Sequence, residues 1–172
     1  MYFELFPTVD YVNFGQTNSK TVTNITKRPA VRQAIKDNLT VFTKHTIRSG
    51  ETPESLAFDL YGDAELHWII LLTNDIYDRY HQWPMNVNQF QTYVNEKYSD
   101  PFATHHFEIS QTSGDTTIKI DIGQDDTDHS GATAVTNYQY EQDRQDRLRQ
   151  IKLVDPSNAN QFISDFSKLM EE

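Results

Sequence analysis

The stretch TIRSGETPESLAFDLYGDAELHWIILLTNDIYD, residues 46–78, predicts the end of a strand, a sharp turn and two consecutive helices. Gly50 permits a positive φ angle, so the chain can turn abruptly there. Thr52 is a good helix N-cap, and the proline that follows it suits the first turn of a helix. Gly62 is expected to end this helix in the left-handed conformation, and Asp63 can cap the next helix at once. The local order is strand, helix, helix, with a return segment after the second helix.

The apolar residues of this stretch indicate how it is buried. Leu56, Ala57, Leu60 and Tyr61 fall on one face of the first helix. The second helix is apolar almost all round between Trp68 and Leu72, which implies burial on several sides. We therefore expect Trp68 to belong to the core.

Outside this stretch, apolar periodicity and turn residues predict further elements. They are a helix over 29–39, a strand over 39–48, an aromatic loop over 76–84, a helix from Asn86 to Tyr98, a β-hairpin over 106–122, an acidic loop over 123–131, an extended piece starting at Tyr138 and Tyr140, a charged segment over 142–150 that is helix or strand, a strand over 151–154 and a last helix from Asp155. In the hairpin, isoleucines alternate with charged residues, which predicts one apolar face away from water (the dry face) and one polar face in contact with water. The fold class is α+β.

The first 28 residues open with an aromatic patch and continue with a polar run rich in Thr and Asn. Thr and Asn are poor helix formers, so we expect an extended N-terminal arm. Two interpretations stay open. The arm is either a peripheral strand packed on its own domain or a segment that docks on a neighbouring protein.

The 172-residue chain has a formal net charge of −10, no cysteine and a hydrophobic fraction of 37%. Nucleic acids and anionic membrane surfaces attract Lys and Arg, so neither is an expected ligand. The lack of cysteine excludes a disulfide scaffold and a thiol nucleophile. The hydrophobic fraction is low for a compact globule. We expect a thin core whose surface segments are completed by partner proteins.

Targeting signals are not expected either. The first six residues lack a basic leader, and the longest apolar run, residues 68–72, is far shorter than a membrane span. The sequence therefore predicts a protein used in the cytosol or in an assembly formed there.

No residue pattern predicts catalysis or a bound cofactor. The sequence has no nucleophile motif and no phosphate-binding loop. His105, His106 and Glu108 are metal-ligand types, but a solvated surface is the favoured interpretation. The aspartates of loop 123–131 suggest calcium, yet no Glu closes the loop as in an EF-hand, so an acidic turn is favoured. We expect a protein that is not an enzyme and binds no metal.

The motif from Thr46 to Asn74 resembles the LysM module, whose signature is a strand, a Gly–acid–Thr turn, two helices, an Asn and a second strand. The resemblance implies a small βααβ core over residues 40–85. It also implies a groove for N-acetylglucosamine polymers between the first turn and the loop after the second helix. The groove residues would be Gly50, Glu51, Thr52, Pro53, Asn74, Asp75, Ile76 and Tyr77. Peptidoglycan binding is therefore the alternative function.

A longer resemblance spans nearly the whole chain. The aromatic N-terminus, the Tyr61-Gly62 and Trp68 pattern and the tail VTNYQYEQDRQDRLRQIKLVDPSNANQFISDFSKLM, residues 135–170, resemble the baseplate wedge protein 53 family of contractile-tailed bacteriophages. The resemblance implies a structural virion protein that joins adjacent wedges around the central hub. It further implies contacts with other wedge subunits and the sheath-initiator protein, several copies in a symmetric baseplate, and assembly in the host cytoplasm.

In this interpretation the LysM-like domain is a rigid peg, flanked by the arm with its helix (1–39), a helix plus β-hairpin (86–134) and a C-terminal docking segment (135–172). The arm and the terminal helix are predicted to bury apolar residues on neighbouring subunits. The predicted interface residues are Tyr2, Phe3, Phe6, Tyr80, Trp83, Tyr138, Tyr140, Phe162 and Phe166.

Overall fold

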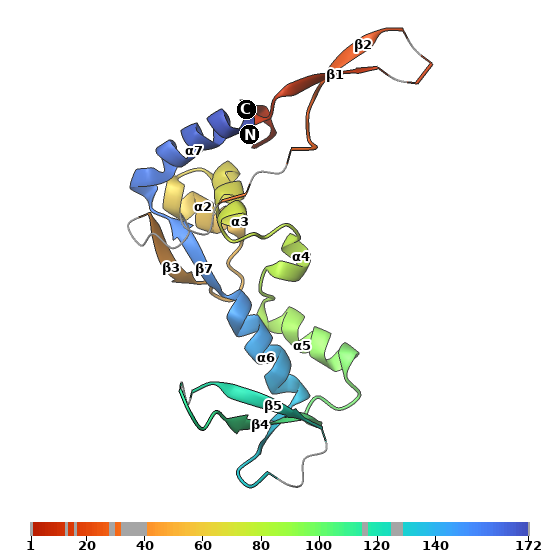
Figure 1. Cartoon of the computed structure of the whole chain (residues 1–172), viewed down its shortest axis with the longest axis vertical. Helices are drawn as coiled ribbons and strands as arrows, with labels where there is room; N and C mark the ends of the chain where they lie inside the picture. The colour runs from red at the N-terminus through yellow and green to blue at the C-terminus, as the bar shows by residue number, and fades with distance from the viewer. Residues whose placement is uncertain are drawn as a thin grey trace. The chain divides into compact units, whose positions relative to one another are not determined.

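The structure is a computed structural model that describes residues 2–12, 14–15, 17–27, 30–31, 41–114, 117–124 and 129–171. The chain forms two compact units, drawn in Figure 1. The first unit comprises residues 1–83 and 150–172, and the second comprises residues 84–149. The chain therefore leaves the first unit after Trp83 and returns to it at Gln150. The helix predicted over 29–39 lies outside the described residues, apart from Ala30 and Val31.

The first unit contains the strand, turn and helices predicted from the opening stretch. Its described elements are the 3-10 helices η1 (Tyr2–Leu5) and η2 (Ala64–Leu66), the strands β1 (Thr8–Val12), β2 (Ser19–Thr23), β3 (Phe42–Thr46) and β7 (Gln150–Val154), and the helices α2 (Pro53–Tyr61), α3 (His67–Thr73), α4 (Arg79–Gln82) and α7 (Pro156–Glu171). The strands expected over 39–48 and 151–154 and the final helix are confirmed.

Both predicted helix starts follow the expected capping chemistry. The Ser55 N–H donates to Oγ1 of Thr52 at 3.2 Å, and the Thr52 N–H donates to Oγ of Ser55 at 3.0 Å, which closes a capping box. Gly62 ends α2 with a left-handed φ of 77°. Asp63 accepts the Glu65 N–H at 2.8 Å, but the element it caps is the 3-10 turn η2, which leads directly into α3.

The strand that pairs with β3 does not follow the second helix. β3 pairs antiparallel with β7, and Phe42 lies opposite Val154. The LysM resemblance implies a second strand soon after Asn74, but the strand that pairs with β3 comes only after the inserted second unit. The predicted aromatic loop over 76–84 also needs correction, since it contains the short helix α4, whose N-cap Asp78 accepts the Tyr80 N–H at 3.0 Å.

Asn74 joins the closing strand to the helices. Its Nδ2 donates to the backbone oxygens of Ile70 and Lys152, both at 2.8 Å, and its Oδ1 accepts the Lys152 N–H at 2.8 Å. One side chain thereby satisfies both backbone groups of Lys152. A neighbouring antiparallel strand would make the same pair of bonds, so Asn74 acts as a one-residue strand against the free edge of β7.

Two apolar clusters hold the first unit together. The first joins α3 to the N-terminus and α7, and its buried members are Phe6, Phe42, Trp68, Ile69, Leu72, Val154, Phe166 and Met170. The second lies around α2 and the sheet, and its buried members are Ile47, Leu56, Ala57, Ile70, Trp83, Ile151 and Leu153. Each large side chain contributes about 1.5–3 kcal/mol when fully buried. The core position predicted for Trp68 is confirmed.

The second unit contains α5 (Val87–Lys97), β4 (Thr104–Ser110), β5 (Lys119–Gly123), β6 (Thr133–Thr136) and α6 (Asn137–Leu148). Its three strands form an antiparallel sheet in the order β5-β4-β6, so the predicted hairpin is confirmed. The helix predicted from Asn86 is also confirmed, with its capping box. The extended piece predicted at Tyr138 and Tyr140 is wrong. Both residues lie in α6, because Thr136 and Gln139 form a third capping box just before them.

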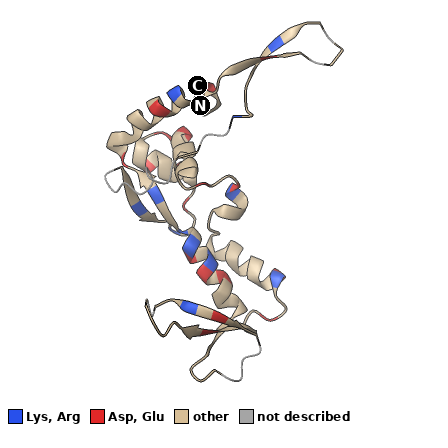
Figure 2. Cartoon of the chain, viewed as in Figure 1, with Lys and Arg blue, Asp and Glu red and all other residues tan. Residues whose placement is uncertain are grey.

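A buried carboxylate links α5 to α6. Figure 2 shows acidic and basic residues interleaved along α6, and among them Glu141 is fully buried. Lys97 Nζ donates to its Oε1 at 2.5 Å and the Tyr98 hydroxyl donates at 2.9 Å. Burial alone would raise the pKa of Glu141, but the hydrogen bonds from Lys97 and Tyr98, and then the charges of Lys97 and Arg144, hold it below the ordinary value.

Replacing Asn74 by Ala is expected to lower the free energy of unfolding by about 2–4 kcal/mol, because both backbone groups of Lys152 lose their partner. Urea unfolding of the purified protein measures this loss. Asn160→Ala, at an exposed position of α7, is the matched control and is expected to change stability little. Equal stability of the two variants would contradict the role of Asn74.

Replacing Glu141 by Gln is expected to cost about 1–3 kcal/mol at neutral pH, because a charged hydrogen-bond acceptor is lost in a buried place. The pKa of Glu141 is lowered in the folded state, so its contribution is fully present above the ordinary carboxyl value of 4.5 and is lost as pH falls through the folded value. Urea unfolding between pH 7 and pH 3 is therefore expected to show the wild type and Glu141→Gln converging in acid. A constant difference across that range would contradict the assignment.

Candidate partner interface

The polar groups of the first half of the predicted sugar groove are bound within the protein. Thr52 caps α2, and Pro53 is fully buried. Glu51 accepts the Arg48 N–H at 2.9 Å and lies 2.9 Å from Nε2 of His45. Burial acts to raise the pKa of Glu51, but the His45 and Arg48 hydrogen bonds outweigh it and lower the pKa. The turn therefore serves the fold, and its acidic side chain is not free to bind a ligand.

Trp83 closes the same turn from the other side. Its indole Nε1 donates to the backbone oxygen of Glu51 at 2.9 Å, and only 9% of the residue is exposed. The prediction that Trp83 is an interface aromatic is therefore not supported by its position. It is a core residue of the second cluster, because its ring fills the space beside α2 while its polar nitrogen still finds a partner.

In the second half of the predicted groove, some residues bond within the protein and others lie on its surface. The amide of Asn74 is occupied by Ile70 and Lys152. Asp75 takes a left-handed φ of 54°, and the Ile76 N–H then donates to the Leu71 oxygen at 2.9 Å. This tight turn leaves Tyr77 outside the core, 69% exposed.

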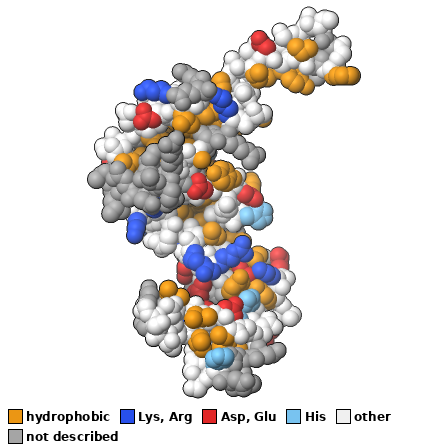
Figure 3. All heavy atoms as spheres, viewed as in Figure 1, with side chains coloured by type: hydrophobic (Ala, Val, Ile, Leu, Met, Phe, Trp, Pro, Cys, Tyr) orange, Lys and Arg blue, Asp and Glu red, His pale blue; other side chains and the backbone are white. Residues whose placement is uncertain are grey.

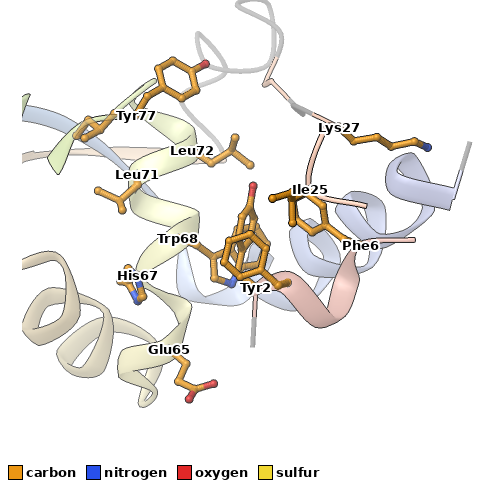
Figure 4. Close-up of a pocket in the computed structure, with 12 residues that line it drawn as sticks. Tyr2, Phe6, Ile25, Lys27, Glu65, His67, Trp68, Leu71, Leu72 and Tyr77 are labelled. Carbon is orange, nitrogen blue, oxygen red and sulfur yellow. The ribbon is translucent and has the colours of Figure 1, made fainter. Parts of the chain in front are cut away.

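Ile76 and Tyr77 line a hollow of about 640 Å³ that contains none of the residues Gly50–Pro53. Figure 4 shows this hollow, whose walls come from η1, the segment after β2 and α3. Its lining residues are Tyr2, Phe3, Phe6, Ile25, Lys27, Glu65, His67, Trp68, Leu71, Leu72, Ile76 and Tyr77. The structure therefore joins the second half of the predicted groove to the N-terminal aromatics of the predicted interface.

Packed aromatic rings make the floor of the hollow rigid. The Tyr2 ring lies 5.3 Å from that of Trp68 and 4.9 Å from that of Phe6, and Trp68 lies 4.7 Å from Phe166. Burial, and then the neighbouring Tyr77, raise the pKa of Tyr2, so its phenol stays neutral. Phe3 stands at the rim and is 58% exposed. A firm apolar floor with exposed rings at its edge is typical of a protein–protein contact site.

The remaining predicted interface residues divide into two groups. Phe6 and Phe166 are buried in the first cluster, and Phe162 is half-buried against it. Tyr138 packs edge-on against Phe90 at 5.3 Å, and Tyr140 stacks on His105 at 4.0 Å, so both serve the second unit. Tyr80 is 86% exposed and stays a candidate contact residue.

The β1–β2 hairpin carries exposed apolar surface on the arm that was predicted to be extended. Val9, Tyr11 and Val12 are 46%, 55% and 52% exposed, and no residue of β1 is buried. Val9 lies opposite Val22 on the paired strand. The pairing of two strands within the arm was not predicted, although Thr and Val are both common in strands. The N-terminal arm is thus a two-stranded ribbon with an open apolar face.

The histidines of β4 are engaged with each other and with the carboxylate beside them. Nδ1 of His105 lies 2.9 Å from Nδ1 of His106, and Nε2 of His106 lies 3.1 Å from Oε1 of Glu108. Within the described part of the chain, no three acidic or histidine side chains are grouped as metal ligands would be. In that part, no helix is long and apolar enough to cross a membrane.

Exposed rings and an open apolar ribbon are typical of a protein that binds other proteins. The chain belongs to the base plate wedge protein 53 family, whose model matches residues 1–106. It is also similar to the baseplate wedge protein gp53 of Enterobacteria phage T4, with 27% identity over 142 residues that cover 73% of this chain and 72% of that protein. The family resemblance indicated by the sequence is confirmed. The protein is a structural subunit of a phage tail baseplate wedge and associates with other baseplate components.

Because the polar groups of the predicted sugar groove are already bound internally, a soluble N-acetylglucosamine trimer is expected to leave the protein unchanged. In an NMR titration to millimolar sugar, the backbone amide signals of Glu51, Thr52 and Asn74 are expected to stay in place. Saturable shifts at these amides would restore the peptidoglycan-binding alternative.

Proposed function

We propose that this wedge subunit joins adjacent wedges and helps to attach them around the central hub. Its partners would be other wedge subunits and the sheath-initiator protein, met in several copies of a symmetric baseplate. Assembly would take place in the host cytoplasm. The observation that carries this proposal is the match to the base plate wedge protein 53 family over residues 1–106, the same residues that contain the hollow and the hairpin.

The hollow supports the proposal because it is a preformed receptor for an apolar group. Trp68 and Phe6 are buried beneath it, while Phe3 and Tyr77 stand exposed at its edge. A partner side chain that enters would cover rings that now face water, and the fixed floor would lose little conformational freedom. Aromatic residues in such positions dominate the binding energy of many interfaces.

The hairpin supports the proposal for a different reason. An isolated two-stranded hairpin is marginally stable in water, and three strands or a packing partner are normally needed. β1 pairs only with β2 among the described strands, and its side chains stay exposed. Docking on a neighbouring subunit would bury Val9 and Tyr11. The hairpin would then be stabilised by the same contacts that attach the chain to its neighbour.

The function needs no chemistry beyond these contacts. The first unit supplies a rigid body, since its closing strand is held by Asn74 and by the Tyr61 hydroxyl, which donates to the Val154 oxygen at 3.0 Å. Burial raises the pKa of Tyr61 to about 12, so this donor keeps its proton at physiological pH. The rigid body would hold the neighbouring wedges at a fixed spacing until the tail contracts.

Cross-linking mass spectrometry on baseplates from a producing lysate tests the proposal. Lys20 on β2 is exposed and can report on the hairpin. Links from Lys20 to other tail subunits, including one wedge on each side, are expected. Links confined to this chain, in tails that contain the protein, would refute the joining role.

Charged residues at the rim of the hollow are expected to block attachment. The double change Phe3→Glu and Tyr77→Glu leaves the buried floor intact but places two carboxylates where an apolar partner group would enter. We expect at least a tenfold loss of this protein from purified tails, about 1.4 kcal/mol or more. The control is Phe58→Glu, at a residue of α2 that is 60% exposed and does not line the hollow. Normal incorporation of the rim variant would contradict the assignment.

A further inference from the structure

The sheet of the second unit has two faces of different character. His106 and Glu108 share one face, since their side chains meet at 3.1 Å, and His106 lies opposite the buried Val135. Helix α6 covers this face, where the ring of its residue Tyr140 meets the His106 ring edge-on at 6.0 Å. Because side chains alternate along a strand, the residues between these must point to the other side.

That other face is apolar. It carries Phe107 and Ile109 from β4, and Ile120 from β5 lies directly opposite Ile109. Ile118 follows on the same side of the chain, and Ala134 of β6 lies opposite Phe107. The predicted alternation of apolar and charged side chains is observed, but the predicted dry face is wrong, since no described element of the second unit covers it.

The exposure of this face is large for isoleucine. Ile118 is 48% exposed and Ile120 is 43% exposed, while Phe107 and Ile109 are half-buried. Figure 3 shows hydrophobic side chains gathered where Figure 1 draws β4 and β5. A contiguous apolar sheet face of this kind normally packs against another layer. The hollow and the hairpin belong to the first unit, so the proposed function does not account for it.

The second unit is acidic as a whole. Residues 84–149 contain eleven Asp or Glu and five Lys or Arg, a net charge of −6. A partner that covers the isoleucines would therefore approach a unit of negative net charge. Complementary charges at the rim of an interface favour association, and like charges oppose it.

The dimensions of the face fit one helix. Neighbouring strands lie about 4.8 Å apart, so three strands present a strip about 10 Å wide. An α-helix with its side chains is about 10–12 Å across. The opposite face of the same sheet is already covered by the helix α6. A second helix on the open side would complete a helix–sheet–helix layer arrangement.

We propose that the open face formed by Phe107, Ile109, Ile118, Ile120 and Ala134 binds an amphipathic helix whose apolar stripe is flanked by Lys or Arg. The inference rests on the proposed function in one respect, namely that another subunit of the baseplate supplies the helix. It adds a second docking surface, on a different unit of the chain, and it states the chemistry of the partner that this surface takes.

Site-specific photo-cross-linking in assembled tails tests the proposal. p-Benzoylphenylalanine is placed at position 120 in one variant and at position 3, on the rim of the hollow, in another. Position 120 is expected to cross-link to a segment of another tail subunit with apolar residues at spacings of three and four and basic residues beside them. Cross-links from position 3 but not from position 120 would overturn the helix proposal and leave the proposed function standing. Cross-links from neither position would overturn both.

Two results identify what binds the open sheet face. One is the sequence of the cross-linked segment, and the other is whether a positive or a negative charge at position 120 disturbs binding more. Cross-links from position 120 to a second copy of this chain, or to an acidic or strand-like segment, would reject a basic helix. Ile120→Lys is expected to reduce the protein in purified tails by about tenfold, since it removes an apolar contact and repels a basic rim. Ile120→Asp loses the same contact without that repulsion and is expected to reduce it less.

Val87→Lys is the matched control, because Val87 is an exposed apolar residue of the same unit that lies outside the sheet. It is expected to incorporate normally. The thermal unfolding midpoints of the free variants are expected to match that of the wild type, which separates loss of docking from loss of folding. Equal incorporation of the Lys and Asp variants, or normal incorporation of both, would reject the charge complementarity.

Discussion

The hydrogen bonds between Asn74 and Lys152 are the constraint on which the first unit depends. They hold a strand that returns only after the whole second unit has been inserted. Closing so long a loop costs entropy, and a two-stranded sheet has few ladder bonds to offset it. The side chain of Asn74 supplies a second partner for β7, and the apolar residues of the strand then complete both clusters of the core. Both clusters therefore depend on the return of one strand.

Local elements could be predicted from the sequence because their signals are local. Thr52, Gly62 and Asn86 each act on backbone groups within a few residues. The helix ends that they cap could therefore be predicted without tertiary information. The pairing of β3 with β7 could not be predicted, since periodicity shows that a strand exists but not which strand it pairs with. The start of α6 was predicted as extended, and its charged part was left open between helix and strand, for a related reason. Its charged residues carry almost no apolar stripe, and its apolar contacts lie near its first turn.

The predicted interface residues divide between the core and the surface of the chain. Aromatic composition shows that large apolar surfaces must be covered, but it does not distinguish a residue's own core from a partner's surface. Phe6, Trp83 and Phe166 are used by the chain itself, whereas Phe3, Tyr77 and Tyr80 are left outside. The difference arises from the position of η1, which turns Phe6 inward and leaves Phe3 at the rim. The predicted groove residues have a second explanation, because a motif shared with sugar-binding modules also meets the needs of the turn itself.

The exposed surfaces that remain have one physical origin. A chain with 37% hydrophobic residues, divided into two units, cannot cover every sheet face and ribbon with its own side chains. In the first unit the shortage leaves the hollow and the hairpin, and in the second it leaves the isoleucine face of the sheet. A protein that acted alone would be penalised for such surfaces by self-association. In a subunit of a larger assembly, we propose that the same surfaces provide the free energy of attachment, and that their distribution over two units allows the chain to be held at more than one place.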